Sequence, residues 1–401
     1  MKSQPFACLA LCALLFIPAC SGAPPSVAGP RLQERTLRIG PPAIAGQDGP
    51  VGQTAIDTPT PPWQGAPGIV RSTADIMAEA ARRPRRTLDL NAPRFKKVAP
   101  DRTGLPQNPA VLPDPVTPAL DREAGPMAAQ TVAAPTVDVA TVADTGSLPP
   151  DTQGDIGPTQ YFAALNGRFR TVSKITGAAD GVINADSDVF FSSVTGGAGT
   201  SDPRVRYDRR TRRWFVIMIT VTVPNRYLVA VGNTFATNGS ITAGTSWTYF
   251  QWTNTRTQGG VGGAASCLGD YPTLGVDEDA LYIGVNQFCG TGLPTLSFDS
   301  TSVYVLNKAS LAGGTLSLAE FDAVLPTGSS SGVYTPQGVD NFDANTNTGY
   351  IIGVDNLQFS TLVLRRVDNP SAAPSLSADV TVAVAATSSP VDVPQQGSSA
   401  K

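Results

Sequence analysis

The sequence has no histidine among its 401 residues. Ser-His-Asp and Cys-His catalytic systems both need an imidazole base, so the sequence excludes them, together with zinc and iron sites that use histidine ligands. A phosphate-binding loop is also missing, because the glycines at 259–263 are not followed by Lys-Ser or Lys-Thr and are typical of a flexible loop.

Aromatic residues are scarce in the first third of the chain. Trp63 and Phe95 are the only two in 21–150, a segment that holds 22 of the 35 prolines. So few large apolar groups cannot offset the entropy cost of ordering a backbone. We therefore expect 21–150 to be a disordered, Pro/Ala-rich tether, with the folded domain in 151–386 and a polar tail over 387–401.

One short stretch of this tether has a helical pattern. Ser72 and Asp75 resemble a capping box, and Pro84 follows the stretch. The pattern predicts a three-turn helix over 72–83, marginal on its own and better suited to contact a partner than to join a core.

The first 20 residues have the pattern of an export signal. One lysine precedes an apolar run that is too short to span a bilayer, and small residues follow. The ending Ile17-Pro18-Ala19-Cys20 resembles a lipobox, which implies lipid attachment at Cys20 and an outer-membrane lipoprotein facing the periplasm or the exterior. The alternative is ordinary secretion with cleavage near Ala19.

Only Cys267 and Cys289 remain outside the leader and the lipidation position. Two cysteines in an exported domain are a disulfide candidate. A hairpin turn centred on 277–279 pairs residues whose numbers sum to 556 or 557, and these two sum to 556. The spacing and the compartment therefore both predict a Cys267–Cys289 bond.

A repeat runs through the last 250 residues. Trp214, Tyr282 and Tyr350 are spaced by 68 and 68 residues, and each opens a strand after a short strand and a polar turn. Repeated hairpins of this size are typical of propeller blades. The run FVIMITV at 215–221 is apolar on both faces, as a strand covered on both sides requires. We predict an all-β, β-propeller-like domain of about four blades, in a ring that is closed, incomplete or open.

Three stretches carry a family resemblance: GDIGPTQYFAALNGRF at 154–169, DPRVRYDRRTRRWFV at 202–216 and DYPTLGVDEDALYIGVNQF at 270–288. They resemble uncharacterised bacterial secreted proteins and lipoproteins with sialidase-like (BNR-type) β-propellers. The resemblance covers most of 150–370 and implies fold and export, but no activity. The Asp-box of true sialidases is only echoed in 242–247, where its Asp is missing.

Carboxylates are the remaining candidates for chemistry. From 151 onward the chain carries 15 Lys+Arg and 20 Asp+Glu, an acidic balance that offers nucleic acid no footprint. Asp202, Asp270 and Asp340 recur near the first strand of each unit and could line a central channel, although short polar residues there are also ordinary turn chemistry. Glu278 and Glu320 are the only glutamates of the domain.

Calcium is the one cofactor with a pattern in the sequence. Asp343, Asn345 and Asn347 alternate as in a calcium loop, and so do the residues of 184–188. Both lack the glycine and the distant glutamate of an EF-hand, and Asn/Asp-rich turns produce the same spacing.

These observations favour a non-catalytic surface module, held at the membrane by its lipid, that binds an extracellular glycan, protein or wall polymer through loops and aromatics such as Tyr271. The alternative is a polysaccharide-acting enzyme that uses Asp residues at the central channel. A third interpretation is a truncated relic without a function of its own.

Overall fold

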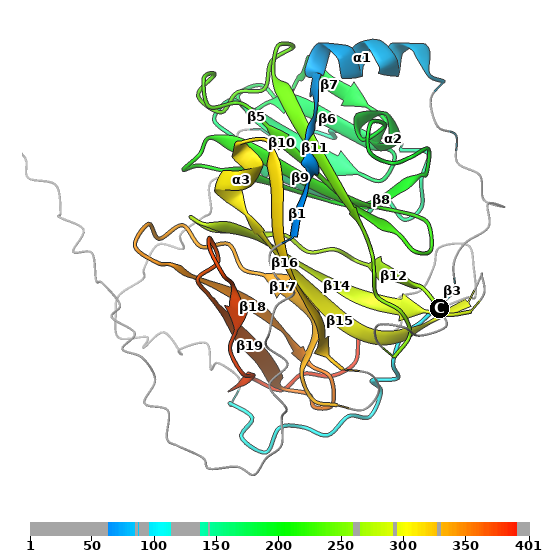
Figure 1. The fold of residues 1–401 in the computed structure, drawn as a ribbon, viewed down its shortest axis with the longest axis vertical. Helices are drawn as coiled ribbons and strands as arrows, with labels where there is room; N and C mark the ends of the chain where they lie inside the picture. Colours follow the sequence, from blue (N-terminus) through cyan, green and yellow to red (C-terminus); the bar gives the residue numbers. More distant parts are fainter. Residues whose placement is uncertain are drawn as a thin grey trace, which may run out of the picture. The chain divides into compact units, whose positions relative to one another are not determined.

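The computed structural model describes residues 63–84, 87, 96–113, 137–142, 145–259, 265–291, 295–326 and 330–390, all within a compact unit that spans Gln53–Lys401. These residues form four antiparallel sheets that follow one another along the chain (Figure 1). We number them blades 1 to 4. The predicted all-β, propeller-like fold of four blades is confirmed.

Each blade is an antiparallel meander; in blade 3 β12 and β13 both pair with β14, and in blade 4 β20 and β21 both pair with β19. Blade 1 contains β4 (Gln153–Ile156), β5 (Gln160–Leu165), β6 (Arg168–Ser173) and β7 (Ala179–Ala185). Blade 2 contains β8 (Thr200–Asp208), β9 (Arg213–Thr220), β10 (Arg226–Gly232) and β11 (Ser246–Thr253). Blade 3 contains β12 (Cys267–Asp270), β13 (Gly275–Val276), β14 (Ala280–Cys289), β15 (Thr295–Asn307) and β16 (Thr315–Leu325). Blade 4 contains β17 (Val333–Gly338), β18 (Thr348–Asp355), β19 (Thr361–Asp368), β20 (Ser375–Leu376) and β21 (Val380–Ala383). The short helices α2 (Ser187–Phe190) and α3 (Lys308–Ala312) lie between strands.

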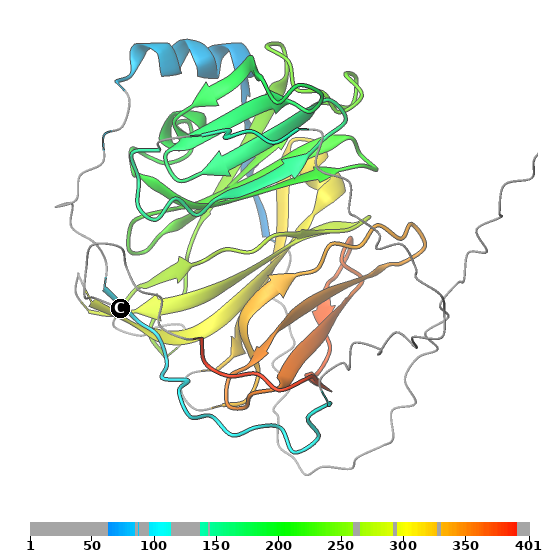
Figure 2. The same ribbon diagram turned by 180° about the vertical axis from the view of Figure 1, so that it is seen from behind.

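Three apolar cores fill the spaces between successive blades. Strand β9 shows the principle, because Trp214 and Val216 pack toward blade 1 while Phe215 and Ile217 pack toward blade 3. This burial on both faces is what the apolar run at 215–221 predicts. The ring stays open between blades 4 and 1: in the described part of the chain, no strand of one is in extensive contact with a strand of the other (Figures 1 and 2).

The equally spaced aromatics lie in the second strand of successive blades but not in equivalent positions. Trp214 belongs to the core between blades 1 and 2, whereas Tyr282 belongs to the core between blades 3 and 4. A register slip of one residue moves a side chain to the opposite face of its strand. The 68-residue spacing thus predicts which strands repeat, but not which side of its strand each aromatic side chain occupies.

Part of the expected tether belongs to the folded domain, which corrects the boundary at residue 150. Strand β1 (Trp63–Pro67) pairs with β16 of blade 3, and β2 (Ile69–Ser72) pairs with β11 of blade 2. The two consecutive strands therefore join the outer edges of two blades. Edge strands bond mainly through their backbone, so a segment with few apolar side chains can still be held. Residues 21–62 and 114–136 lie outside the described residues.

The predicted helix forms as α1 (Thr73–Arg82), and its capping box is present, since the Ser72 hydroxyl accepts from the Asp75 amide at 3.1 Å. It is not a free element, however. Ile76 is completely buried in the core between blades 1 and 2, and the Trp247 indole donates to Thr73 Oγ1 at 3.0 Å. Tertiary packing supplies the stability that a helix of this length lacks alone.

The rest of the described N-terminal region also lies along the blades. Strand β3 (Lys96–Val98) pairs with β15 in parallel, and the Leu112 amide donates to Val384 at the end of blade 4. On blade 1, Arg170 donates to the Thr141 carbonyl at 2.7 Å. At the other end of the chain, Thr387 Oγ1 accepts from the Ser360 amide at 2.8 Å, so the expected tail is attached where it starts. Residues 391–401 lie outside the described residues.

The predicted disulfide is present between Cys267 and Cys289, whose Cα atoms are 4.1 Å apart. The two residues face each other in the β12–β14 ladder, and Val276 faces Leu281 next to the turn, in the predicted register. The leader and Cys20 lie outside the described residues. Among those that are described, no helix is long and apolar enough to cross a bilayer.

Candidate functional site

Every blade has one residue with an unusual backbone in or next to its first strand: Asp151 precedes β4, Asp202 and Thr335 lie within β8 and β17, and Tyr271 directly follows β12. Asp151, Asp202, Tyr271 and Thr335 have φ values of 42°, 59°, 52° and 51°. This left-handed region costs a residue other than glycine on the order of 1 kcal/mol or more. In blades 2 and 4 the ladder register shifts at this point, as in a β-bulge, a device that re-aims side chains.

The strained entries of blades 1, 2 and 3 are tied together by direct bonds. Asn166 donates from its side chain to Asp151 at 2.7 Å and accepts from the Asp202 amide at 2.8 Å. Asp202 in turn accepts from the Tyr271 amide at 3.1 Å. The carboxyl groups of Asp151 and Asp202 lie close enough for Asp202 to raise the pKa of Asp151. Asp270 precedes Tyr271 in blade 3, so three successive blades each contribute one acid.

Asp202 helps to raise the pKa of both Asp151 and Asp270. Burial raises the pKa of Asp151 to about 6, with a further contribution from Asp202. Burial also raises the pKa of Asp270, again helped by Asp202, while Lys97 lowers it through an ion pair of 2.7 Å. Two cationic side chains, Lys97 and Arg204, lie beside these three acids.

An aromatic ring stands beside the acids. Tyr271 is 48% exposed, and the guanidinium of Arg204 lies 4.7 Å from the centre of its ring. Arg204 is itself buried, which lowers its pKa, although Tyr271, Asp202 and Asp151 counteract this effect. Because Arg204 occupies one side of the ring, the rest of the ring is left to a ligand or solvent.

One buried polar atom in this region lacks a bonding partner among the described residues. Asn286, which faces Asp270 across the β12–β14 ladder, donates its amide to Thr335 Oγ1 at 3.1 Å. Its Oδ1 accepts nothing, although only 6% of the residue is exposed. A buried acceptor without a donor costs about 1–3 kcal/mol, so it indicates a place for a water or a ligand hydroxyl. We refer to Asp151, Asp202, Arg204, Asp270, Tyr271 and Asn286 as the entry cluster.

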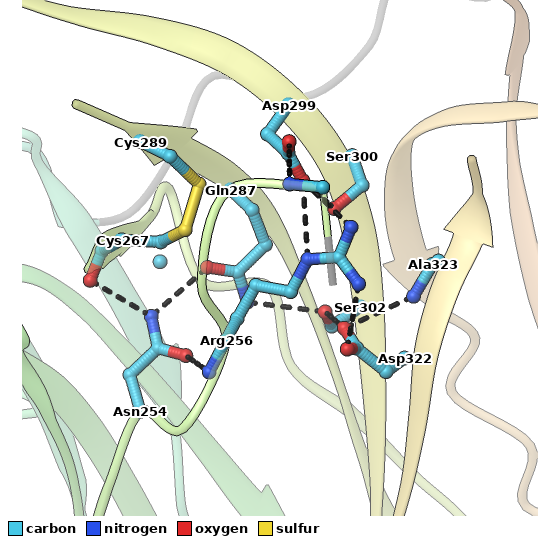
Figure 3. The surroundings of a disulfide bond; sticks show 12 residues. Asn254, Arg256, Cys267, Gln287, Cys289, Asp299, Ser300, Ser302, Asp322 and Ala323 are labelled. Carbon is cyan, nitrogen blue, oxygen red and sulfur yellow. Dashed lines mark hydrogen bonds and ion pairs between the residues drawn. A yellow bond between two sulfur atoms is a disulfide. The ribbon is translucent and has the colours of Figure 1, made fainter. Parts of the chain in front are cut away.

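A second polar group lies beside the disulfide and has the opposite character (Figure 3). Arg256 donates to Asp299 at 2.7 and 3.1 Å and to Asp322 at 2.8 Å. Asn254 bonds the Cys267 carbonyl and Gln287, and Gln287 donates to Ser302 at 3.1 Å. We call Asn254, Arg256, Gln287, Asp299, Ser302 and Asp322 the bridge network. Its bonds fix the connection between blades 2 and 3.

The structure places the acids named from sequence in different regions. Asp202 and Asp270 come together in the entry cluster, but Asp340 does not join them: it accepts from Arg206 at 2.8 Å and from the Val276 amide at 3.0 Å. Asp340 thus bonds to both β8 and β13 at a point outside the entry cluster. Asp151, which sequence reasoning missed, takes the third place.

The two glutamates also lie apart from the entry cluster. Glu278 forms an ion pair with Arg210. Glu320 lies in β16 beside Asp322, and burial raises its pKa to about 7 with help from that neighbour.

One calcium candidate lies in a turn, and the other spans the end of β7 and the start of α2. Asp343 accepts from the Asn345 amide at 2.9 Å in an exposed turn, to which Asn347 also belongs. In the other candidate segment, Asp186 caps α2 and Asp188 accepts from the Thr200 amide at 2.7 Å. Across the described ranges, no group of three or more His, Cys, Asp or Glu side chains is arranged to hold a metal ion.

No family model and no curated protein matches the chain. Among solved structures, an exo-β-1,3-galactanase from Clostridium thermocellum is 11% identical over 58% of this chain and 48% of its own, with a TM-score of 0.31. A protein of Bifidobacterium bifidum s17 assigned the same activity is 14% identical over 57% and 70%, with a TM-score of 0.30. The chain thus spans about half the length of the first galactanase. Likenesses this distant transfer no activity.

Proposed function

We propose that the chain is a cell-surface carbohydrate-binding module whose contact site is the entry cluster. The observation that carries the proposal is the convergence of Asp151, Asp202 and Asp270 from three blades beside the half-exposed ring of Tyr271. Carboxylates accept hydrogen bonds from hydroxyl groups, and an aromatic ring packs against the apolar face of a sugar ring. A neutral saccharide has both hydroxyl donors and an apolar ring face, and it adds no negative charge that the acids would repel.

The unsatisfied Asn286 Oδ1 supports a ligand rich in donors, because a hydroxyl group could complete its bonding. The strained entries support a ligand site for a separate reason. Backbone strain persists where the surrounding structure holds it, and it is frequent at ligand clamps. Three of the left-handed residues, Asp151, Asp202 and Tyr271, belong to the entry cluster, which supports a ligand site there.

The test is a glycan array probed with the full chain and with Tyr271→Ala. We expect the wild type to bind neutral saccharides and the variant to lose at least about tenfold in affinity, the loss expected of a central aromatic contact. Phe235→Ala is the matched control, because Phe235 is 57% exposed and stacks with Arg212 at 5.4 Å, outside the entry cluster. Equal binding by wild type and Tyr271→Ala would refute the proposed site.

The proposal includes export and lipid attachment at Cys20, which places the module in the cell envelope. A disulfide supports export, because such bonds persist in oxidising compartments. Metabolic labelling with a fatty acid tests the anchor: we expect label on the wild type and none on Cys20→Ala. Label on neither protein would favour plain secretion.

A second candidate function is polysaccharide hydrolysis, and one observation favours it. The pKa of Asp151 is raised to about 6, as a general acid requires. The tie between Asp151 and Asp202 counts against it: both bond to the single side chain of Asn166, whereas paired carboxyls of glycosidases stand about 5–10 Å apart. Reducing-end release from a polysaccharide panel separates the functions: hydrolysis that is lost in Asp151→Asn would favour the enzyme.

A further inference from the structure

Two phenyl rings are exposed at the surface of the domain, and an arginine lies over each of them. Phe235, in the loop between β10 and β11, is 57% exposed, and the Arg212 guanidinium lies 5.4 Å from the centre of its ring. Phe342, in the loop between β17 and β18, is 48% exposed, and the Arg209 guanidinium lies 5.5 Å from its ring centre. We call Arg209, Arg212, Phe235 and Phe342 the arginine patch.

The two arginines belong to one turn, between β8 and β9, so the two ring contacts form a single patch. Burial raises the pKa of the Tyr207 phenol, and Arg212 and Arg209 both counteract this rise, so both guanidinium groups lie near that one phenol. Next to the turn, Arg206 of β8 donates to Asp340 at 2.8 Å, which joins blade 2 to the loop that carries the second ring. The patch therefore spans loops of blades 2 and 4.

Internal hydrogen bonds fix the turn that carries the arginines. Asp208 accepts from the Arg210 amide at 3.0 Å and from the Thr211 hydroxyl at 2.6 Å. The Thr234 hydroxyl donates to the Arg212 carbonyl at 2.6 Å, which attaches the turn to the loop of the first ring. A surface that is fixed before its partner arrives loses less entropy on binding.

The guanidinium groups of the patch have no carboxylate of their own in the part of the chain that the structure describes. Three carboxylates beside the turn are paired with other cations, in the ion pairs Asp208–Lys308, Asp340–Arg206 and Glu278–Arg210. Asp343, which follows Phe342, accepts from the Asn345 amide within its own turn. Two positive charges are therefore left for a partner, and they select an anionic one.

The chemistry of the patch favours a protein over a polysaccharide. A guanidinium that stacks on a ring keeps donors free at the edge of its plane, where they fit a carboxylate. A phenyl ring adds apolar area but no hydrogen-bonding group, so it offers nothing to the hydroxyl groups of an acidic sugar. Aromatic residues and arginine are enriched in protein interfaces, whereas lysine is depleted, and both cations of the patch are arginine.

We propose that the arginine patch is a docking site for an acidic segment of another protein, in which carboxylates stand beside apolar side chains. Seven residues of β8 and its turn separate Asp202 from Arg209, which places the patch roughly 20 Å from the entry cluster at about 3.3 Å per residue. The two sites are therefore distinct, and one module connects a saccharide to a protein.

Biolayer interferometry of the full chain against a random copolymer of glutamate and tyrosine tests the proposal, with polyglutamate of equal length as the comparison for charge alone. The wild type is expected to bind the copolymer at least about tenfold more tightly than polyglutamate. Arg209→Gln/Arg212→Gln loses at least about tenfold in affinity for the copolymer, because it removes both guanidinium groups. Arg366→Gln is the matched control, since Arg366 is an exposed arginine of blade 4 that pairs with Asp368.

A second double variant separates the rings from the charges. Phe235→Ala/Phe342→Ala should lower the affinity for the copolymer to that for polyglutamate, and should leave the affinity for polyglutamate unchanged. All four side chains of the patch are exposed, so neither double variant disturbs an apolar core. Far-UV circular dichroism checks that both variants keep the fold.

Copolymer binding that both double variants leave unchanged would overturn the proposal, as would a wild type that binds neither polymer. Polygalacturonate and phosphatidylglycerol vesicles identify other occupants: tighter binding of either one than of the copolymer, through the same four residues, would assign the patch to polysaccharide or lipid and also overturn the proposal. Glycan binding by the entry cluster is measured separately, so none of these results affects the proposed sugar site.

Discussion

The entry cluster and the bridge network both include residues of blade 3, and they solve the problem of buried charge in opposite ways. In the bridge network Arg256 lies between two carboxylates, and only 5% of its side chain is exposed. In the entry cluster Asp202 lies between two other acids, and the cations beside these three acids are Lys97 and Arg204. The first arrangement satisfies its charges and holds the fold together. The second keeps like charges close, which costs stability, and that cost points to function.

The largest expected effect comes from breaking the satisfied cluster. Arg256→Met keeps most of the side-chain volume but leaves Asp299 buried without its guanidinium. Removing one partner of a buried pair costs about 3–5 kcal/mol, and urea unfolding measures the loss. Arg366→Met is the control, because Arg366 and Asp368 form an exposed pair worth at most about 1 kcal/mol. Similar losses of unfolding free energy in both variants would show that the buried bridge network contributes no more to stability than an exposed ion pair.

A smaller effect of opposite sign is expected in the entry cluster. The pKa of Asp151 is raised from 3.8 to about 6, so the folded state binds more protons than the unfolded state between these values. This group therefore favours folding at low pH, and its contribution is lost as pH rises through about 6.

Asp151→Asn removes this loss while its Oδ1 can still accept from Asn166. We expect the variant to be more stable than the wild type by roughly 1–2 kcal/mol at pH 7.5 and equal to it near pH 4. Chemical denaturation at both pH values measures the difference. A variant that is less stable at pH 7.5 would mean that the like charges in the entry cluster are compensated.

How far the sequence predicts these two regions depends on the kind of signal that each leaves. The disulfide beside the bridge network follows from the hairpin register, because antiparallel pairing fixes which residue numbers face each other. The four blades follow from repeated strands. Arg256 left no signal, since its partners Asp299 and Asp322 are brought to it by tertiary packing alone.

The entry cluster was only partly predictable. Asp202 and Asp270 were found through the repeat, but Asp151 fell at the expected domain boundary, where the Pro-rich composition argued for a tether. A usable signal was the dipeptide that opens the units: Asp202, Tyr271 and Thr335 each precede a proline. The same composition concealed β1 and β2, which are held through backbone pairing with β16 and β11.

We infer that the entry cluster gives up stability for binding, and Asp202→Asn tests this inference most directly. The asparagine can accept from the Tyr271 amide and donate to Asp151, so it replaces a repulsive contact by a hydrogen bond. On one preparation of the variant, the free energy of unfolding should rise and the affinity for the glycan should fall, relative to the wild type. A variant that is less stable yet binds as the wild type does would contradict the account.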